Sequence, residues 1–134
     1  MTAARRRIAT VALVVRDYDE AKTWYTAMLS FEVFADIPMG EGKRWVVVGP
    51  PNAETRLLLA RAAAPDQTAR IGDQTGGRVF LFLETDDFDR DFQAMTARGV
   101  KFREAPRHEA YGTVAVFEDL YGNLWDLLEP STQM

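Results

Sequence analysis

The length, composition and charge of this chain exclude several classes of protein. Its 134 residues are 47% hydrophobic and 27% charged, a balance typical of one compact globular domain and not of a disordered or fibrous chain. The formal net charge of −4 disfavours a nucleic-acid surface, and no apolar run reaches the roughly 20 residues that span a bilayer. Because the chain has no cysteine and no signal-type segment at its start, we predict a cytoplasmic protein without nucleic-acid or membrane partners.

The first module is predicted to run from about residue 8 to residue 61. It opens with a β-rich segment from Ile8 to Val15, in which apolar residues occupy both alternating sets, so both faces of this strand are expected to be buried. A helix should begin after Asp17, because Asp17 and Glu20 have the spacing of a capping box. Three strands are predicted next, at about residues 32–35, 44–48 and 56–61, with turn-type sequences at 38–42 and 49–52 between them.

The second module is predicted to occupy about residues 78–130, after a polar, alanine-rich linker at about 62–77. It begins with a short apolar strand from Val79 to Leu83. Asp87 is the expected N-cap of the following helix, and Gly99 stands where a left-handed C-terminal cap belongs. Strands at about residues 101–103, 113–118 and 124–128 complete the module.

The two modules repeat one order of elements. Residues 15–19 match residues 85–89 at the two helix starts, and the hairpin at 45–59 matches the hairpin at 113–127. A unit of this size cannot close a core alone, so the two copies must pair. The predicted fold is therefore α+β, with two tandem βαβββ modules forming a curved mixed sheet around a cavity, in a single domain at 1–134.

The residues that open the first helix and close the last hairpin point to a known family. The helix entry at 15–17, followed by Ala21 and Tyr25, and the closing segment 118–126 resemble the vicinal oxygen chelate (VOC) superfamily, which includes glyoxalases, bleomycin resistance proteins and extradiol dioxygenases. The resemblance covers Ile8 to Pro130 and implies the paired βαβββ fold and a homodimer. Because members share a scaffold and differ in chemistry, it specifies the fold better than the reaction.

The metal site of this family is expected to be missing here. The resemblance places the family's four ligand positions at Thr10, Leu58, Phe80 and Asp126. Only Asp126 is a competent ligand, since a neutral hydroxyl is a weak donor and the other two side chains coordinate nothing. We therefore expect no cofactor and no classical metal ligands. The alternative is an atypical divalent-metal site around Asp126, Glu84 and His108.

Without a metal, the predicted cavity is apolar and aromatic, which suits a small organic ligand. An alternative for the aromatic residues is that they fill an ordinary core. The side chains predicted to bind the ligand come from the strands and from the 106–112 loop, which in relatives lies over the cavity mouth: Thr10, Trp45, Leu58, Phe80, Phe82, Glu109, Tyr111 and Trp125.

Asp126, Glu84 and His108 are the candidate catalytic residues. An inward carboxylate is costly unless it has a partner, so Asp126 and Glu84 are expected either to bind a cationic or hydroxylated ligand or to accept a proton. In the structural alternative, Asp126 accepts hydrogen bonds from a Trp45 or Trp125 indole or a tyrosine hydroxyl, and Glu84 pairs with Arg78 or Arg16.

Two functions follow from these residues. The first is a metal-free binding protein, similar to the bleomycin-sequestering proteins, that holds a planar ligand against aromatic side chains. The second is a VOC-type lyase, isomerase or dioxygenase that uses an atypical metal site or carboxylate acid-base chemistry.

Overall fold

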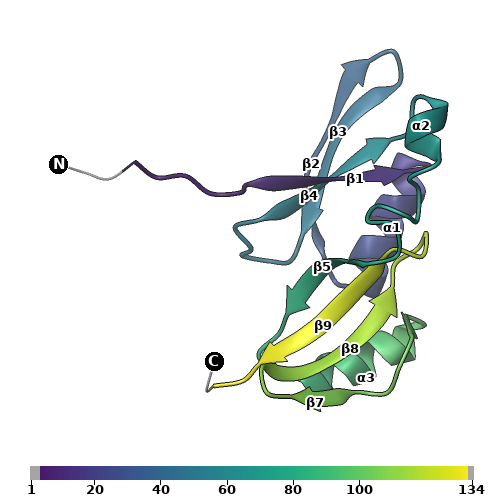
Figure 1. Cartoon of the computed structure of the whole chain (residues 1–134). Coiled ribbons are helices and arrows are strands. Elements are labelled where there is room, and N and C mark those ends of the chain that lie inside the picture. The colour runs from purple at the N-terminus through teal and green to yellow at the C-terminus, as the bar shows by residue number, and fades with distance from the viewer. Residues whose placement is uncertain (1–3, 133–134) are drawn as a thin grey trace. The chain divides into compact units, whose positions relative to one another are not determined.

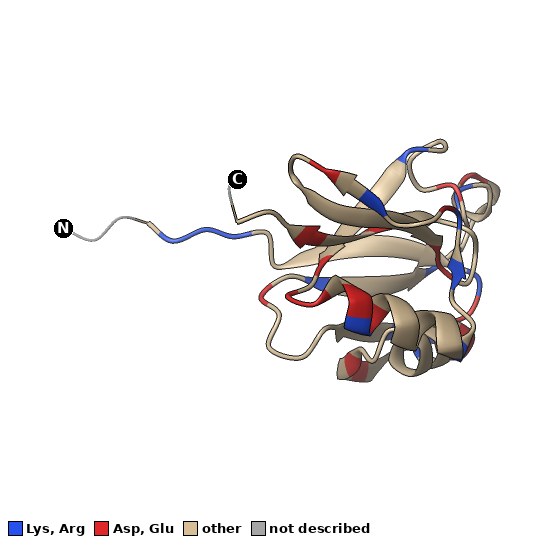
Figure 2. Ribbon diagram, turned by 90° about the horizontal axis from the view of Figure 1, so that it is seen from below, with Lys and Arg blue, Asp and Glu red and all other residues tan. Residues whose placement is uncertain are grey.

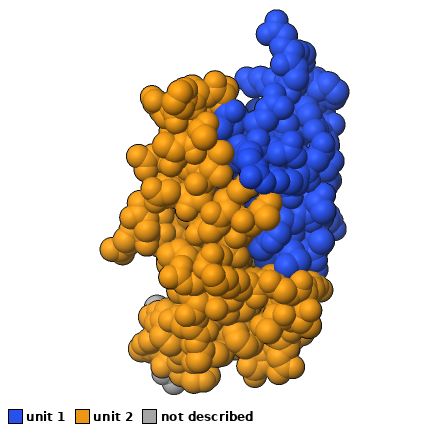
Figure 3. Space-filling model, turned by 90° about the vertical axis from the view of Figure 1, so that its right-hand side faces the viewer, with its two compact units in different colours: residues 1–62 blue, residues 63–134 orange. Residues whose placement is uncertain are grey.

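The computed structural model describes residues 4–132. The chain divides into two compact units, unit 1 at residues 1–62 and unit 2 at residues 63–134 (Figure 3). Unit 1 contains β1 (Thr10–Val15), α1 (Tyr18–Met28), β2 (Glu32–Gly40), β3 (Lys43–Gly49) and β4 (Arg56–Arg61). Unit 2 contains α2 (Pro65–Thr68), β5 (Val79–Glu84), α3 (Phe88–Arg98), β6 (Lys101–Phe102), β7 (Arg107–Glu109), β8 (Gly112–Glu118) and β9 (Leu124–Pro130).

Each unit is a mixed sheet with a long helix against one face (Figure 1). The strand order is β1-β4-β3-β2 in unit 1 and β5-β9-β8-β6 in unit 2, where β7 also pairs with β8. The β1–β4 and β5–β9 pairs are parallel and the other pairs are antiparallel. The predicted α+β class and tandem order of elements are confirmed, and unit 2 has one strand more than predicted. That the whole chain acts as one domain stays a prediction.

The predicted helix caps are confirmed. Asp17 Oδ2 accepts a hydrogen bond from the Glu20 amide at 2.8 Å. Asp87 Oδ1 accepts one from the Arg90 amide at 3.1 Å. Each cap satisfies one of the backbone N–H groups that a helix start leaves without an intrahelical partner. Gly99 ends α3 with a φ of 101°, a conformation that costs glycine little because it has no Cβ.

The helix-facing side of each sheet forms the core of its unit. In unit 1, Leu13, Val48 and Leu59 are fully buried, with α1 packed against β3 and β4. In unit 2, aromatic rings follow one another from the helix to the sheet with centroid separations of 5.5, 4.4, 5.6 and 5.8 Å, in the order Phe88, Phe92, Phe102, Phe117 and Trp125. Burial of these side chains is the main favourable contribution to folding of each unit.

A partly buried ion-pair cluster ties α1 to the neighbouring strands of unit 1. Asp36 Oδ2 lies 2.7 Å from Lys22 Nζ and 2.8 Å from an Arg44 guanidinium nitrogen. Arg44 also contacts Asp19 at 2.9 Å. Hydrogen bonds from Arg44 and Lys22 lower the pKa of the Asp36 carboxyl to about 2, because they stabilise its ionised form.

Three predictions about the strands are corrected. β2 runs through Pro38 to Gly40, where a turn was predicted, because it is an edge strand and an edge tolerates proline. Residues 107–109 form β7 and not a loop, so the segment 106–112 is a hairpin. Thr10 and Ala12 of β1 are exposed, so the first strand is not buried on both faces as predicted.

The linker and the N-terminal segment lie outside the two sheets. The predicted linker contains the one-turn helix α2. Arg5, Arg6 and Arg7 lie in the N-terminal segment ahead of β1 (Figure 2). None of the helices among residues 4–132 is long and apolar enough to cross a membrane.

Candidate ligand-binding site

The face of the unit 1 sheet opposite α1, here called the open face of unit 1, carries small and apolar side chains. Strand register aligns Ala12, Leu58, Val47 and Ala35 in one row across β1, β4, β3 and β2. Trp45 lies two residues before Val47 on β3 and therefore on the same face. It is 43% exposed. The sequence thus places a large indole on a sheet surface that its own helix does not cover.

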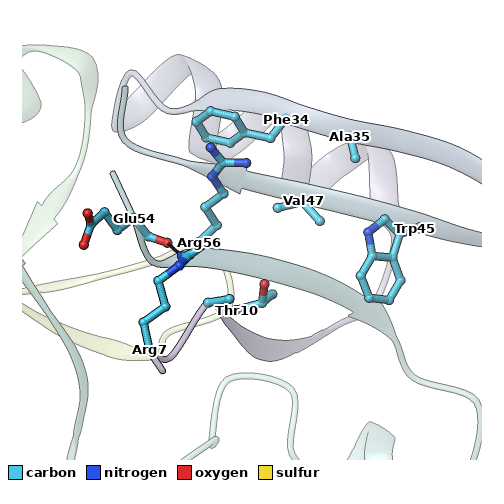
Figure 4. Close-up of a pocket in the computed structure, with 9 residues that line it drawn as sticks. Arg7, Thr10, Phe34, Ala35, Trp45, Val47, Glu54 and Arg56 are labelled. Atoms are coloured by element: carbon cyan, nitrogen blue, oxygen red, sulfur yellow. Dashed lines mark hydrogen bonds between the residues drawn. The ribbon is translucent and has the colours of Figure 1, made fainter. Parts of the chain in front are cut away.

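A pocket of about 250 Å³ lies on this open face. Figure 4 shows the Arg56 guanidinium against the Phe34 ring at one end of the pocket and the Trp45 indole at the other. Two of the predicted ligand-binding residues, Thr10 and Trp45, line it, and its full lining is Arg7, Ala9, Thr10, Phe34, Ala35, Trp45, Val47, Glu54 and Arg56. The pocket therefore combines an apolar floor with a few polar groups, which is the usual character of a small-molecule site.

Arg56 is held in a defined orientation within this pocket. Its guanidinium carbon lies 3.6 Å from the centroid of the Phe34 ring, which is a close cation–π contact. Gly49, at the end of β3, makes room for the pair, because a Cβ there would lie 3.3 Å from Arg56 Cγ and 3.4 Å from Phe34 Cε2. The stack occupies one face of the guanidinium and leaves the in-plane N–H groups for other partners.

The segment before β1 borders the same pocket. The Arg56 amide donates to the Ala9 carbonyl at 3.0 Å, and Thr55 Oγ1 donates to the Ile8 carbonyl at 2.7 Å. The Arg7 side chain donates to the Glu54 carbonyl oxygen, as the dashed line in Figure 4 shows. These contacts place a second guanidinium at the rim of the pocket.

The face of the unit 2 sheet opposite α3 is here called the open face of unit 2. It differs from that of unit 1 because it carries a buried carboxyl group. Register aligns Phe82, Asp126 and Val116 across β5, β9 and β8. Phe82 is 61% exposed, whereas Asp126 is only 7% exposed. Asp126 Oδ1 is buried and has no hydrogen-bond partner within residues 4–132. An acceptor in this condition is costly and is suited to a donor brought by a ligand.

Charges near Asp126 come from the edge of the sheet. Glu104 Oε2 accepts a hydrogen bond from the Val116 amide at 3.1 Å and lies 3.0 Å from Arg107 Nε. Burial raises the pKa of the Asp126 carboxyl, Arg107 opposes this shift and Glu104 adds to it. Asp126 is therefore closer to its neutral form than an exposed aspartate would be.

The other predicted residues are distributed as follows. Glu84 is exposed at the end of β5. It shares a cross-strand row with Leu128 and Val114. Leu58 is half-buried in the open-face row of unit 1, and Phe80 is half-buried on β5. Trp125 stacks on Phe117 at 5.8 Å in the helix-side core, 3% exposed, so it does not lie on the open face.

The β7–β8 hairpin brings together the three candidates from the 106–112 segment. His108 is exposed, and its Nδ1 lies 3.2 Å from Thr113 Oγ1. Glu109 Oε1 lies 2.9 Å from Arg107 Nη1. Tyr111 is 37% exposed. They form a polar strip along β7 and its turn, whereas Asp126 lies on β9 across β8 from this edge.

The side chains at the metal positions predicted from the family resemblance do not fit a divalent ion. Thr10 offers one neutral oxygen, Leu58 offers none, and the β5 residue paired with Asp126 is Phe82. Within residues 4–132 no group of three or more His, Asp or Glu side chains is placed to hold a metal ion. One carboxylate with hydrocarbon neighbours is a poor ligand set for any first-row divalent metal.

Sequence reasoning missed several residues of these faces. Arg56 could have been found, because it precedes Leu58 by two positions on one strand and alternation puts both on one face. Phe34 could not, because the register of β2 shifts between Val33 and Ala35 and a shift of this kind breaks the alternation. Glu104 and Arg107 gave no signal, since their position depends on how the chain returns to β8.

Comparison with known proteins identifies the class of protein. The sequence model of the Glyoxalase/Bleomycin resistance protein/Dioxygenase superfamily matches residues 7–127. The chain therefore belongs to this superfamily, and the resemblance seen in the sequence is confirmed. The homodimer and the cytoplasmic location that we predicted stay predictions.

Individual relatives are close over nearly their whole length. An uncharacterized protein of Shewanella frigidimarina (strain NCIMB 400) is 56% identical over 127 residues, which cover 93% of this chain and 94% of the relative. The crystal structure of UcmS2 has a TM-score of 0.82 at 32% identity and covers 94% of this chain and 99% of its own. TnmS3, an antibiotic binding protein from Streptomyces sp. CB03234, has a TM-score of 0.78 at 31% identity, covering 97% and 100%.

Proposed function

We propose that this protein binds a small organic ligand with a planar aromatic part on the open faces of its sheets, without a divalent metal. The observation that carries the proposal is the pocket of unit 1, where an exposed indole borders a floor of small apolar side chains. The similarity to TnmS3, which is an antibiotic binding protein, supports the same class of function.

Exposed aromatic rings on sheet surfaces are the physical reason for this proposal. Trp45 and Phe82 are 43% and 61% exposed, although both stand on strands whose opposite faces are core. Each square ångström of apolar surface removed from water contributes about 25 cal/mol, and stacking adds about 0.5–1.5 kcal/mol per aromatic pair. A flat ligand on either open face would cover the exposed ring of that face and gain both contributions.

The buried Asp126 carboxyl favours a second candidate function. A carboxyl group whose pKa is raised by burial can act as a general acid or base. On this alternative the protein is a lyase, isomerase or dioxygenase of the superfamily that uses Asp126, with Glu84 and His108 as further candidates, through acid-base chemistry or an atypical metal site.

The binding proposal is tested by isothermal titration calorimetry with 2-naphthol, an uncharged planar probe. We expect saturable binding that Trp45→Leu weakens about tenfold, the size of one lost aromatic contact. Leu120→Ala is the matched control, because Leu120 is an exposed apolar residue that does not line the pocket. Equal affinity in the native protein and the Trp45→Leu variant would contradict the proposal.

Elemental analysis and a thermal-shift titration with divalent ions distinguish the metal-dependent enzyme from the binding protein. Protein purified without chelator is expected to contain no stoichiometric metal, and Ni²⁺, Zn²⁺, Fe²⁺ or Mn²⁺ should not raise its melting temperature. A bound metal whose stabilising effect disappears in Asp126→Ala would favour the enzyme and reject the metal-free binding protein.

A further inference from the structure

We propose that the ligand class of the unit 1 pocket is an aromatic anion, whose carboxylate or similar acid group is bound by Arg56 while its ring covers Trp45. This inference rests on the proposed binding function and names the chemistry of the ligand. Sequence reasoning did not assign Arg56 any role.

The orientation of the Arg56 guanidinium is the first observation that supports this ligand. The Arg56 guanidinium carbon lies 3.6 Å from the centroid of the Phe34 ring, a contact that restrains the group, and the missing side chain of Gly49 leaves room for the stem. A guanidinium held in this way presents two parallel N–H groups that match the two oxygens of a carboxylate. Little side-chain entropy remains to be lost when an anion binds.

The lack of an internal partner is the second observation. Arg44, Arg90 and Arg107 each form an ion pair with a carboxylate of the same unit. Among residues 4–132, Arg56 has no such carboxylate, and its guanidinium lines a pocket. A partly buried cation whose only described partner is an aromatic ring is well placed to accept an anion from outside the protein.

The surroundings of Arg56 match an anion with an aromatic part. Arg7 adds a second positive charge at the pocket, and Thr10 adds a hydroxyl. Glu54 is the one acidic residue in the lining, and in Figure 4 it lies at the end away from Trp45. Arg56 and Trp45 also lie apart in that view, with Ala35 and Val47 between them, so an acid group and a ring of one ligand can reach both.

Two probes of the same shape test this proposal. The affinities of 2-naphthoate and 2-naphthamide are measured by isothermal titration calorimetry at pH 7, where only the first is charged. We expect the native protein to bind 2-naphthoate about tenfold or more tightly than 2-naphthamide. We also expect this preference to fall as ionic strength rises from 0.02 to 0.5 M, because salt screens a partly exposed charge pair.

Variants assign the preference to Arg56. Arg56→Met keeps an apolar stem beside Phe34 and should reduce the ratio of the two affinities to about one. Arg56→Lys keeps the charge but not the planar fork, and should retain only part of the preference. Arg61→Met is the matched control, because Arg61 belongs to the same strand and lies over Tyr18 outside the pocket.

The outcomes separate this inference from the function on which it rests. Equal binding of both probes to the native protein overturns the aromatic anion and leaves the binding function standing. A preference that survives in Arg56→Met overturns the role of Arg56. If neither probe binds at millimolar concentration, the binding function fails and this inference fails with it.

Discussion

Unit 1 and unit 2 are alike on the helix-facing side of their sheets and differ on the open side. Leu59 and Leu127 occupy equivalent positions in β4 and β9, and both are fully buried. One position earlier the equivalents are Leu58 and Asp126. A packed core requires apolar side chains on the helix-facing side, whereas the open faces carry different chemistry in the two units.

The outer edges of the two sheets differ as well. In unit 1 the nine-residue strand β2 completes the sheet beside β3. In unit 2 two short strands, β6 and β7, pair with β8, and Glu104 between them binds the Val116 amide. A continuous edge leaves an aromatic pocket in unit 1, and an interrupted edge brings Glu104 and Arg107 near a buried acid in unit 2.

The largest expected effect is on the free energy of unfolding, and it tests the helix-facing side, which is alike in the two units. Leu59→Ala and Leu127→Ala should each lower the free energy of unfolding by about 2–5 kcal/mol, because each leaves a cavity in a packed core. Leu58→Ala, on the half-buried open face of unit 1, should cost clearly less. Urea denaturation followed by circular dichroism measures all three. An equally large loss in Leu58→Ala would mean that the open face is core.

A smaller effect tests the difference on the open side. Asp126→Leu gives unit 2 the residue that unit 1 has at the equivalent position, and it should raise the free energy of unfolding at pH 7 by about 1–3 kcal/mol by removing a buried acceptor without a partner. Chemical denaturation of the native protein and this variant gives the value. A destabilised Asp126→Leu would show that the carboxyl stabilises the fold.

The smallest effects are on the pKa values of two aspartates, which should shift in opposite directions in the two units. Carboxyl ¹³C NMR should place the pKa of Asp36 at about 2 and that of Asp126 above the ordinary 3.8. A lowered folded pKa means that the stability from Asp36 is present above pH 3.8 and is lost as the pH falls towards 2. A raised one means that Asp126 favours the folded state at acid pH and that this contribution is lost as the pH rises through its folded pKa.

Asparagine variants show which aspartate causes each change of stability with pH. Asp36→Asn should flatten the loss of stability on the acid side, and Asp126→Asn should remove the decline in stability as the pH rises through the folded pKa of Asp126. If both aspartates titrate near 3.8, the electrostatic contrast between the units is refuted.

Much of the fold could be predicted because its signals are local. Asp17 and Asp87 cap helices through bonds to residues three positions away, and Gly99 ends α3 through its own backbone. The edges of the sheets were predicted less well. Pro38 suggested a turn, and only the edge position of β2 shows why the strand continues through it.

The candidate site could be predicted only in part, because its residues depend on contacts between distant segments. The family resemblance pointed to Thr10, Leu58 and Asp126, and all three lie on open faces. Strand alternation was not applied to Trp125, which is adjacent to Asp126 and therefore faces the helix. Phe34 and Arg56 meet because β2 shifts its register and Gly49 leaves space, and neither condition is visible in the residue types.

The sequence by itself determined the repeated α+β architecture and the helix boundaries, because periodicity and capping act over a few positions. Only the tertiary structure decided that Arg56 is stacked on Phe34, and only it decided that Asp126 is buried with a free acceptor atom. Those features depend on strand register, edge pairing and burial, which arise when segments far apart in the chain are packed together.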